Sequence, residues 1–437
     1  MINKEKVRVL MKAQGIGTQT ELAEKMHITK NQLSVLLSPK FDPIKANTRL
    51  LCNLLKVEIK DIIREKPENM YLEFDDLEEE TKPSKSLTDR YIDIRNVVPD
   101  KKYNVVELFA GAGGLALGLE LAGFYSLGLV EVDKYACKTL RENRPNWNVI
   151  QEDIIKVTEK GIKTYLPEPN AEVDLLSGGF PCQAFSFAGN KLGLNDVRGT
   201  MFYYYAKALE ELKPKMFLAE NVRGLVNHDD GKTLSTMISV FSEIGYTVSW
   251  EVLRAVNYHV SQKRERLVMV GIRNDLVGTI NYKFPEPYGY ILPLRDVLKD
   301  TPKSEGTKYP DSKRKVLEMV PPGGYWRDLP EDIAKEYMGK SYYSGGGRTG
   351  MARRLSWDEP SLTLTCSPAQ KQTERCHPDE TRPFNVREYA RIQSFPDSWR
   401  FNCSVNNAYK QIGNAVPVNM AEAVGRSIIR SLNLLNS

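Results

Sequence analysis

The stretch NVVELFAGAGG, residues 104–114, joins a short apolar run to a glycine-rich turn. The apolar run predicts a buried strand, and the glycines predict a tight turn because glycine adopts backbone angles that other residues avoid. Residues 115–122 then have the pattern of a helix, and residues 127–131 have that of a second strand. We expect a strand–turn–helix–strand unit in which the main chain approaches a nucleotide and Glu131 binds its ribose hydroxyls.

Strands and helices continue to alternate beyond this unit. Further strand-like runs occur at residues 148–154, 173–177 and 216–222, and residues 262–272 are first basic and then strand-like. The alternation predicts an α/β fold with a mostly parallel sheet, whose strand ends bring ligand-binding residues to one edge. Asp153 follows the third strand and could accept a hydrogen bond from an adenine amino group; the alternative is that Glu131 and Asp153 only cap helices. The glycine turn alone fits enzymes that bind nicotinamide cofactors as well as enzymes that bind S-adenosylmethionine.

A second glycine-rich loop, GGFPCQAFS at residues 178–186, follows one of the predicted strands. Its two glycines allow a sharp turn, and Pro181 restricts the backbone just before Cys182. A free cysteine is often an ordinary buried thiol. A rigid, tight loop is not needed for packing alone, so the setting favours Cys182 as a reactive nucleophile.

The composition limits the class of protein. A chain of 437 residues, 41% hydrophobic and 27% charged, predicts about two or three globular domains. No apolar run reaches the roughly 18 residues that a membrane span needs, and the N-terminus has no signal-peptide core, so we expect a cytoplasmic protein. The six cysteines are scattered without C-x-x-C pairs, which predicts reduced thiols and no metal site.

Residues 1–64 carry an excess of Lys and Arg and predict a run of short helices. One helix at 20–26 and a second at 30–37 are separated by only a few residues. This arrangement resembles the helix-turn-helix of small phage repressors, in which the second helix enters the major groove of DNA. The exposed face of that helix would carry Lys30, Asn31, Gln32 and Ser34. The basic charge favours DNA binding over the alternative, a helical bundle that mediates protein contacts.

Several sequence blocks follow one another along the rest of the chain: FAGAGG at 109–114, GFPCQ at 179–183, ENV at 220–222, QKRER at 262–266, REYARIQSFPD at 387–397 and GNAVP at 413–417. Their order and content resemble the DNA cytosine-5 methyltransferases. The resemblance covers residues 103–275 and 382–432. One departure is Asn385, where a threonine is more usual, and we expect that position to be structural.

The resemblance implies S-adenosylmethionine as the cofactor. The resemblance also implies which residues contact the adenine, the ribose and the methionine part of this cofactor. Phe109 would stack on the adenine, with main-chain contacts from Gly111, Gly114 and the neighbouring Leu115, a ribose contact from Glu131, an adenine contact from Asp153, and a methionine end bordered by Pro181, Asn414 and Val416.

The resemblance also implies covalent catalysis on a cytosine base. Carbon 5 of cytosine is a poor nucleophile, and adding a thiolate to carbon 6 turns the ring into an enamine that can attack a methyl group. Cys182 would supply the thiolate, and Glu220 would share a proton with ring nitrogen 3. Arg266, with Arg264 beside it, would bind the base oxygen and a nearby phosphate.

A target base inside a duplex must be rotated out of the stack to reach such a site. Residues 183–198 are polar and contain glycine, and we expect them to close over the DNA as a lid. Lys191, Asn195 and Arg198 would then lie near phosphates.

The expected domain order is a helix-turn-helix domain at 1–64, an acidic linker at 65–100, a catalytic domain at 101–275, a target-recognition region at 276–381 and a last segment at 382–437 that returns to the catalytic domain. The fold class is therefore α/β: a methyltransferase with a Rossmann-like sheet, an inserted small recognition domain and an all-α N-terminal domain.

The favoured function is methylation of cytosine carbon 5 in a specific duplex DNA sequence, within a restriction–modification system. We expect a monomeric methylase whose N-terminal module could dimerise on an operator and regulate transcription. Three alternatives stay open at this point: an RNA cytosine methyltransferase, a non-catalytic regulator on the same scaffold and, from the glycine turn alone, a nicotinamide dehydrogenase.

Overall fold

The computed structural model describes residues 90–181, 197, 199–343 and 349–436, together with residues 7, 11, 16 and 18–25 near the N-terminus. The chain divides into two units, Met1–Lys82 and Pro83–Ser437. In the first unit, helix α2 spans Gln19–Lys25, where the first helix of the helix-turn-helix is expected. The expected second helix, with Lys30, Asn31, Gln32 and Ser34, lies outside the described residues.

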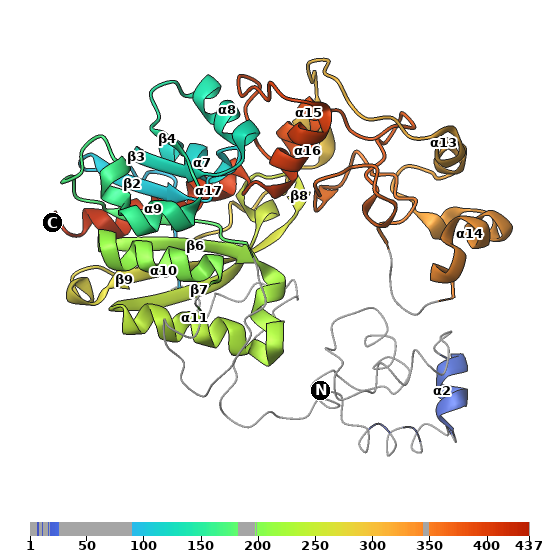
Figure 1. The fold of residues 1–437 in the computed structure, drawn as a ribbon. Coiled ribbons are helices and arrows are strands. Elements are labelled where there is room, and N and C mark those ends of the chain that lie inside the picture. Colours follow the sequence, from blue (N-terminus) through green and yellow to red (C-terminus); the bar gives the residue numbers. More distant parts are fainter. Residues whose placement is uncertain are drawn as a thin grey trace. The chain divides into compact units, whose positions relative to one another are not determined.

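A seven-stranded sheet forms the centre of the second unit, in the order β4-β3-β2-β5-β6-β9-β7 (Figure 1). The first five of these strands run parallel, and β9 runs antiparallel to both of its neighbours. The bounds are β2 Tyr103–Leu108, β3 Phe124–Glu131, β4 Val149–Gln151, β5 Leu175–Gly178, β6 Met216–Val222, β7 Tyr246–Arg254 and β9 Glu265–Arg273. The predicted α/β class with a mostly parallel sheet is confirmed.

Helices cover both faces of this sheet. On one face lie α9 (Ile154–Lys160), α10 (Met201–Leu212) and α11 (Lys232–Glu243), packed on a core that includes Val106. On the other face lie α7 (Gly114–Ala122) and α17 (Val418–Asn433), packed on a core that includes Val105. Successive strand residues point to opposite faces, so two neighbouring valines of β2 belong to different cores.

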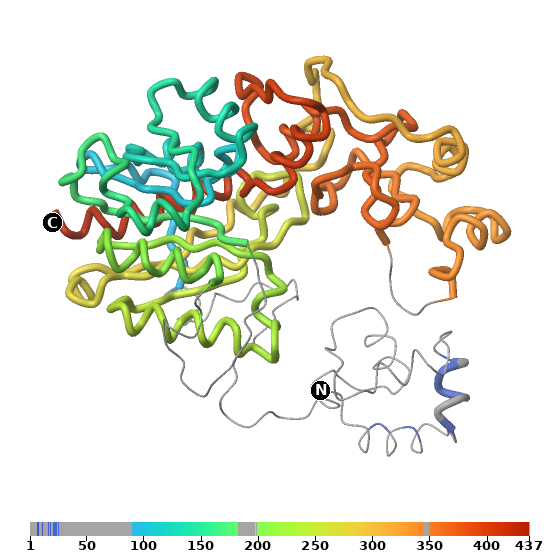
Figure 2. The backbone as a smooth tube through the Cα atoms, viewed as in Figure 1, coloured from blue at the N-terminus to red at the C-terminus, as the bar shows by residue number. Residues whose placement is uncertain are grey.

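The last helix returns to the beginning of the sheet. A Cβ atom added to Gly118 of α7 would lie 2.4 Å from the Cβ of Ala421 in α17, so the two helices are in direct contact. The tube in Figure 2 shows this C-terminal segment beside the strands that open the sheet. The loop that precedes α17 is thereby held next to the glycine turn that precedes α7.

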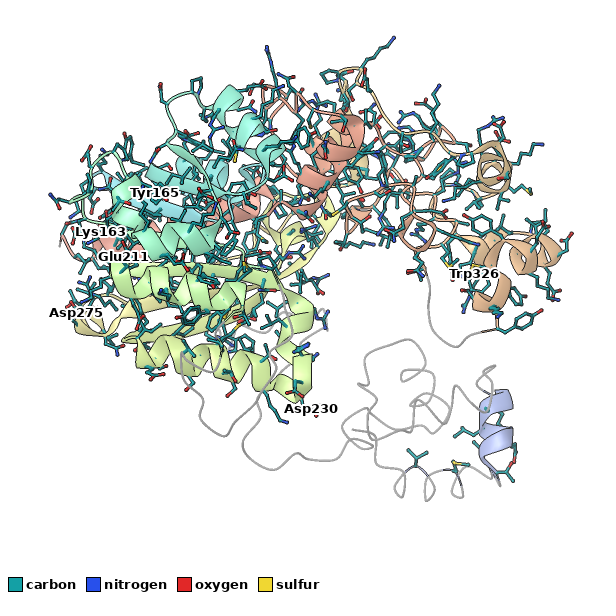
Figure 3. The ribbon with its side chains drawn as sticks, viewed as in Figure 1. Lys163, Tyr165, Glu211, Asp230, Asp275 and Trp326 are labelled. Atoms are coloured by element: carbon teal, nitrogen blue, oxygen red, sulfur yellow. The ribbon has the colours of Figure 1, made fainter. Side chains whose placement is uncertain are left out.

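Two further elements complete the covering of the sheet. Helix α8 (Lys134–Asn143) follows β3, and the short helix η1 (Ile162–Tyr165) follows α9. Glu211 of α10 accepts hydrogen bonds from the main-chain amides of Ile162 and Lys163, which ties η1 to α10 (Figure 3).

Residues between β9 and α17 form a smaller and largely irregular region with its own core. Tyr309, Leu317, Leu329 and Ala352 are buried together there, with Trp326 packed against them (Figure 3). The helices of this part of the chain are α12 Leu294–Leu298, α13 Asp311–Glu318, α14 Glu331–Met338, α15 Val386–Ile392 and α16 Val405–Asn414.

Short strands connect this region to the sheet domain. β8 (Gln262–Lys263) pairs in parallel with β11 (Ser361–Leu362), just before the start of β9. β1 (Tyr91–Ile92) pairs with β10 (Phe284–Pro285). The remaining short helices are η3 Arg223–Gly231, η4 Ala255–Tyr258, η5 Asn274–Leu276, η6 Trp326–Asp328, η7 Gly339–Ser341 and η8 Lys371–Thr373. None of the described helices is long and apolar enough to cross a membrane.

Candidate active site

A cavity of about 540 Å³ opens at the carboxyl ends of the parallel strands. It is bordered by the glycine turn after β2, the end of β3, the loop after β5, the end of β6 and the segment that joins α16 to α17. The predicted residues that line it are Phe109, Gly111, Gly114, Leu115, Glu131, Pro181, Glu220, Arg264, Arg266, Asn414 and Val416. Residues far apart in the sequence therefore meet at one site, at the sheet edge where α/β folds bind ligands.

The glycine turn needs glycine for two different reasons. Gly111 has a φ of +55°, a backbone angle that side chains rarely adopt, although a Cβ there would meet nothing within 4 Å. At Gly114 the reason is space, since a Cβ would lie 2.2 Å from the carbonyl oxygen of Val416. The start of α7 thus touches the main chain of the opposite cavity wall, and the two walls are positioned against each other.

Glu131 is anchored by the main chain around it. One carboxylate oxygen accepts from the amide of Gly111 at 2.7 Å, and the other accepts from the amides of Val132 and Asp133 at 2.9 and 2.8 Å. Helix α8 is capped by Asp133 rather than by Glu131. The fixed carboxylate faces the cavity and retains lone pairs that could accept from ribose hydroxyls.

Asp153 lies in a different setting. It is the N-cap of α9, where its side chain accepts from the amide of Ile155 at 2.9 Å, and it does not line the cavity. Asp153 therefore acts as a helix cap, which was the alternative to adenine binding, and its contact with adenine stays a prediction.

Glu220 and Arg266 form an ion pair inside the cavity. Arg266 Nε lies 2.6 Å from Glu220 Oε1, and each side chain is 13% exposed. The two residues come from the adjacent antiparallel strands β6 and β9, and Arg266 lies opposite Val222, two residues beyond Glu220. Such diagonal neighbours are within reach of long side chains, and the bonded guanidinium fixes the direction of the carboxylate.

The loop after β5 passes over Glu220. A Cβ added to Gly179 would lie 2.7 Å from Glu220 Oε2, so any larger residue there would displace the carboxylate. Buried Asn221 donates from Nδ2 to the carbonyl oxygen of Phe180 at 3.1 Å and supports the loop. Cys182 lies outside the described residues, but it directly follows Pro181, which lines the cavity.

Arg264 also lines the cavity, but its guanidinium is held by main chain. The side chain is 1% exposed and donates to the carbonyl oxygens of Leu364 at 3.3 Å and Gly413 at 3.1 Å. Burial and the nearby Arg266 lower its pKa to about 9. The predicted contact with the base or a phosphate stays a prediction, whereas the contacts present connect two walls of the site.

Other predicted DNA contacts cannot be placed. Lys191, Asn195 and Arg198, like most of the predicted lid, lie outside the described residues. Within the described part of the chain, no group of three His, Cys, Asp or Glu residues is arranged to hold a metal ion.

Two features of the cavity were not anticipated from the sequence. Glu107 is 2% exposed, accepts from Ser177 Oγ at 3.2 Å and has its pKa raised to about 8 by burial. Lys410 pairs with Asp133 at 3.0 Å and joins α16 to the start of α8. Glu107 lies one residue before the end of β2, so the strand pattern could have predicted its position near the cavity. The pairing of Lys410 with Asp133 joins residues 277 positions apart, and no local pattern predicts it.

The sheet, with a cavity at the carboxyl ends of its parallel strands, gives the chain the arrangement of the α/β enzymes that bind nucleotides. A family model described as C-5 cytosine-specific DNA methylase matches residues 103–430, and one described as a Cro/C1-type HTH DNA-binding domain matches residues 6–68. The chain belongs to the C-5 cytosine-specific DNA methylase family and is a DNA cytosine methyltransferase.

Individual relatives agree with this assignment. The chain is 56% identical to Type II methyltransferase M.Sau96I of Staphylococcus aureus over the full length of both chains. It is 59% identical to Type II methyltransferase M.Eco47II of Escherichia coli over 347 residues, 78% of this chain and 82% of the relative. The DNMT2 structure from Spodoptera frugiperda aligns with a TM-score of 0.53 at 17% identity, covering 77% of this chain and 100% of that one, and shows the shared fold.

Proposed function

We propose that the chain transfers a methyl group from S-adenosylmethionine to carbon 5 of a cytosine that is flipped out of duplex DNA, as the methylase of a Type II restriction–modification system. The observation that carries the proposal is the single cavity that joins the glycine turn and Glu131 to the Glu220–Arg266 pair. The full-length similarity to a Type II methyltransferase supports the biological setting.

The residues present fit S-adenosylmethionine. The cavity volume lies within the range of about 300–1,000 Å³ typical of ligand pockets. Glu131, with its carboxylate fixed by three amides, would bind the ribose, and Phe109 and Leu115 offer apolar surface for the adenine. Pro181, Asn414 and Val416 would border the methionine end. When bound, the cofactor supplies the activated methyl group.

The protein's own groups would activate the base. The Cys182 thiolate would add to carbon 6, because the enamine formed at carbon 5 is a far better nucleophile than the aromatic ring. Glu220, oriented by Arg266, would share a proton at nitrogen 3 and so offset the negative charge that the ring gains. After transfer, loss of the carbon 5 proton expels the thiolate and restores the aromatic ring.

The remaining donors of Arg266 would bind the base oxygen. Its Nε is engaged with Glu220, and Nη1 donates to the carbonyl oxygen of Glu265 at 2.8 Å. A guanidinium carries five N–H groups, so others remain for a ligand. Arg266 would thereby align the catalytic carboxyl and the substrate base together.

Contacts to DNA would come from three parts of the chain. Lys30, Asn31, Gln32 and Ser34 would read a major groove, residues 183–198 would close over the flipped base, and residues 276–381 would select the sequence. By this proposal the N-terminal module also represses transcription from an operator near its own gene.

The test is methyl transfer by the full-length protein from tritium-labelled S-adenosylmethionine to unmethylated genomic DNA. Digestion to nucleosides should place the label in 5-methyldeoxycytidine, and bisulfite sequencing should map it to one short sequence. Label in adenine, or transfer to RNA but not to duplex DNA, would contradict the proposal.

A further inference from the structure

Two buried glutamines form a chain of hydrogen bonds behind the cavity. Gln262 accepts from the amide of Leu364 at 2.9 Å and donates from Nε2 to Gln393 Oε1. Gln393 in turn donates from Nε2 to the carbonyl oxygen of Ala415 at 2.5 Å. Both glutamines are 0% exposed, so each polar atom depends on these partners.

The ends of this chain fix its direction. Leu364 presents a main-chain N–H, which needs an acceptor, and Ala415 presents a carbonyl oxygen, which needs a donor. A main-chain N–H can only donate and a main-chain carbonyl oxygen can only accept. Each glutamine side-chain amide therefore has only one orientation in which all of these hydrogen bonds form. Gln393 must therefore donate to Ala415, and a side chain that only accepts cannot replace it.

Gln393 also holds the neighbouring main chain. Its carbonyl oxygen accepts from the amide of Val418 at 3.3 Å, at the start of α17. The two contacts of Gln393 are thus at Ala415 and Val418. Ala415 and the following residue, Val416, line the cavity, whereas Gln393 does not. On its other side, Val416 meets the glycine turn, where Gly114 leaves no room for a Cβ.

The other end of the chain leads to the catalytic strand. Gln262 lies four residues before Arg266, and Arg264 between them donates to the carbonyl oxygen of Gly413. The segment 262–266 therefore contacts the wall that borders the methionine end directly through Arg264 and indirectly through Gln393, and it contacts Glu220 through Arg266.

We propose that Gln393 is a positioning residue for the cofactor: it holds Ala415 and Val416 at a set distance from the segment that carries Arg266. This rests on the proposed function, because it assigns the wall formed by these residues to S-adenosylmethionine. Loss of the donor at Gln393 should weaken cofactor binding although Gln393 touches no ligand.

The variant Gln393→Glu tests the direction of the hydrogen bond. A glutamate keeps the acceptor for Gln262 but turns an oxygen toward the oxygen of Ala415. Burial raises the pKa of such a carboxyl, so at low pH the protonated form can donate to Ala415 again. The affinity for S-adenosylhomocysteine should fall about 10-fold at pH 8.5 and recover toward that of the wild type at pH 6.

The measurement is isothermal titration of S-adenosylhomocysteine into full-length protein at several pH values. Gln393→Met, of similar size and without a proton donor, should bind about 10-fold more weakly at every pH. Gln370→Glu, on an exposed glutamine, is the matched control and should bind as the wild type does. Thermal unfolding reports whether each variant is folded.

Wild-type affinity for Gln393→Met, or a loss in Gln393→Glu that does not change with pH, overturns the proposal. Gln393→Met decides the question if Gln393→Glu does not fold. The wild-type protein serves as the separate test of the proposed function: its failure to bind S-adenosylhomocysteine or to methylate DNA rejects that function, whereas a failure confined to the variants rejects only the role of Gln393.

Discussion

At the scale of single residues, the site depends on how a few charged groups are held. Glu131 is fixed by three main-chain amides, and Glu220 is fixed by Arg266. Groups oriented before the ligand arrives need no reorganisation during the reaction, which is the main source of electrostatic catalysis. The site therefore depends on how these carboxylates are oriented as well as on which residues carry them.

Glu220→Gln removes the carboxyl but keeps its shape. Proton transfer by a positioned group contributes about 100- to 10,000-fold, so we expect methyl transfer to slow by that factor while the protein stays folded. Steady-state kinetics with labelled cofactor measures the change. Glu210→Gln, an exposed carboxyl on α10, is the matched control, and equal activity of the two variants would exclude a catalytic role for Glu220.

Glu107 predicts a pH dependence of stability. Burial raises its pKa from 4.5 to about 8, so the folded protein keeps a proton that the unfolded chain loses above pH 4.5. Its contribution to stability is therefore complete below pH 4.5 and is lost as the pH rises to about 8. Glu107→Gln should remove a slope of up to about 1.4 kcal/mol per pH unit. Denaturant unfolding of the cofactor-free protein from pH 5 to 8.5 measures this slope; an unchanged slope would contradict the prediction.

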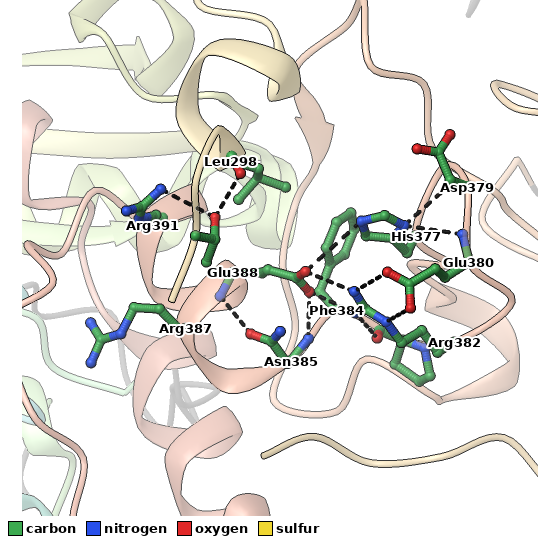
Figure 4. Close-up of polar contacts among 12 residues, drawn as sticks. Leu298, His377, Asp379, Glu380, Arg382, Phe384, Asn385, Arg387, Glu388 and Arg391 are labelled. Atoms are coloured by element: carbon green, nitrogen blue, oxygen red, sulfur yellow. Dashed lines mark hydrogen bonds and ion pairs between the residues drawn. The ribbon is translucent and has the colours of Figure 1, made fainter. Parts of the chain in front are cut away.

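At the scale of elements, a network of charged side chains around the buried Glu388 joins α15 to the chain before it (Figure 4). Arg382 bonds both carboxylate oxygens of Glu388 at 2.8 and 2.9 Å and also pairs with Glu380. Glu388 closes a capping box with Asn385 at the start of α15. His377 lies 3.8 Å from Glu388, and burial lowers the pKa of its imidazole. Asn385 is thus an effective cap in place of the more usual threonine.

Glu388→Ala should destabilise the protein by about 2–4 kcal/mol, because it removes one half of the capping box and leaves Arg382 without its buried partner. Glu318→Ala, which breaks the exposed pair with Arg314, should cost only about 0.5 kcal/mol. Urea unfolding of both variants compares the two costs. Similar losses would mean that the network around α15 contributes no more than a surface pair.

Elements with a regular pattern could be predicted from the sequence. The run at 104–122 predicts β2, the turn and α7 because apolar residues and glycines give a local signal. The run at 262–272 predicts a basic stretch followed by a strand, and the structure shows β9 there. It does not predict the short strand β8, which is separated from β9 at Arg264, where the side chain turns inward to donate to the carbonyl oxygen of Gly413. The core around Tyr309 and Ala352 had no local signal, because its polar and irregular segments are held by contacts between distant residues.

The same distinction applies to the site. Most of the predicted cofactor residues line the cavity, since short motifs with fixed spacing carried them. The pairing of Gln262 with Gln393 and that of Lys410 with Asp133 each join residues more than 100 positions apart, and neither could be predicted from any single stretch of sequence.

At the scale of the whole molecule, the chain divides into two units, with the boundary in the sequence after residue 82. A Cro/C1-type model matches residues 6–68, and the methylase model begins at residue 103. All residues that line the cavity belong to the second unit. Methylation should therefore depend on residues 83–437, and operator binding on the N-terminal unit.

A protein that begins at Pro83 should keep its rate of methyl transfer within about threefold, because every group proposed for the chemistry is retained. It should lose any binding to the DNA upstream of its own gene. Kinetics and gel-shift titration at a fixed salt concentration measure both properties. Loss of methylation together with normal thermal unfolding would show that the N-terminal unit takes part in catalysis.

The central claim is that Cys182 attacks the flipped cytosine. Random-sequence duplex DNA amplified with 5-fluorodeoxycytidine offers every short target site, and fluorine at carbon 5 blocks the final proton loss, so the adduct persists. With S-adenosylmethionine present, full-length protein should form a stable complex whose peptide map carries the nucleotide on Cys182. Cys182→Ala should form none, and Cys52→Ser, at a cysteine outside the residues that the methylase model matches, should react normally. An adduct on another residue, or methylation by Cys182→Ala at the wild-type rate, would contradict the account.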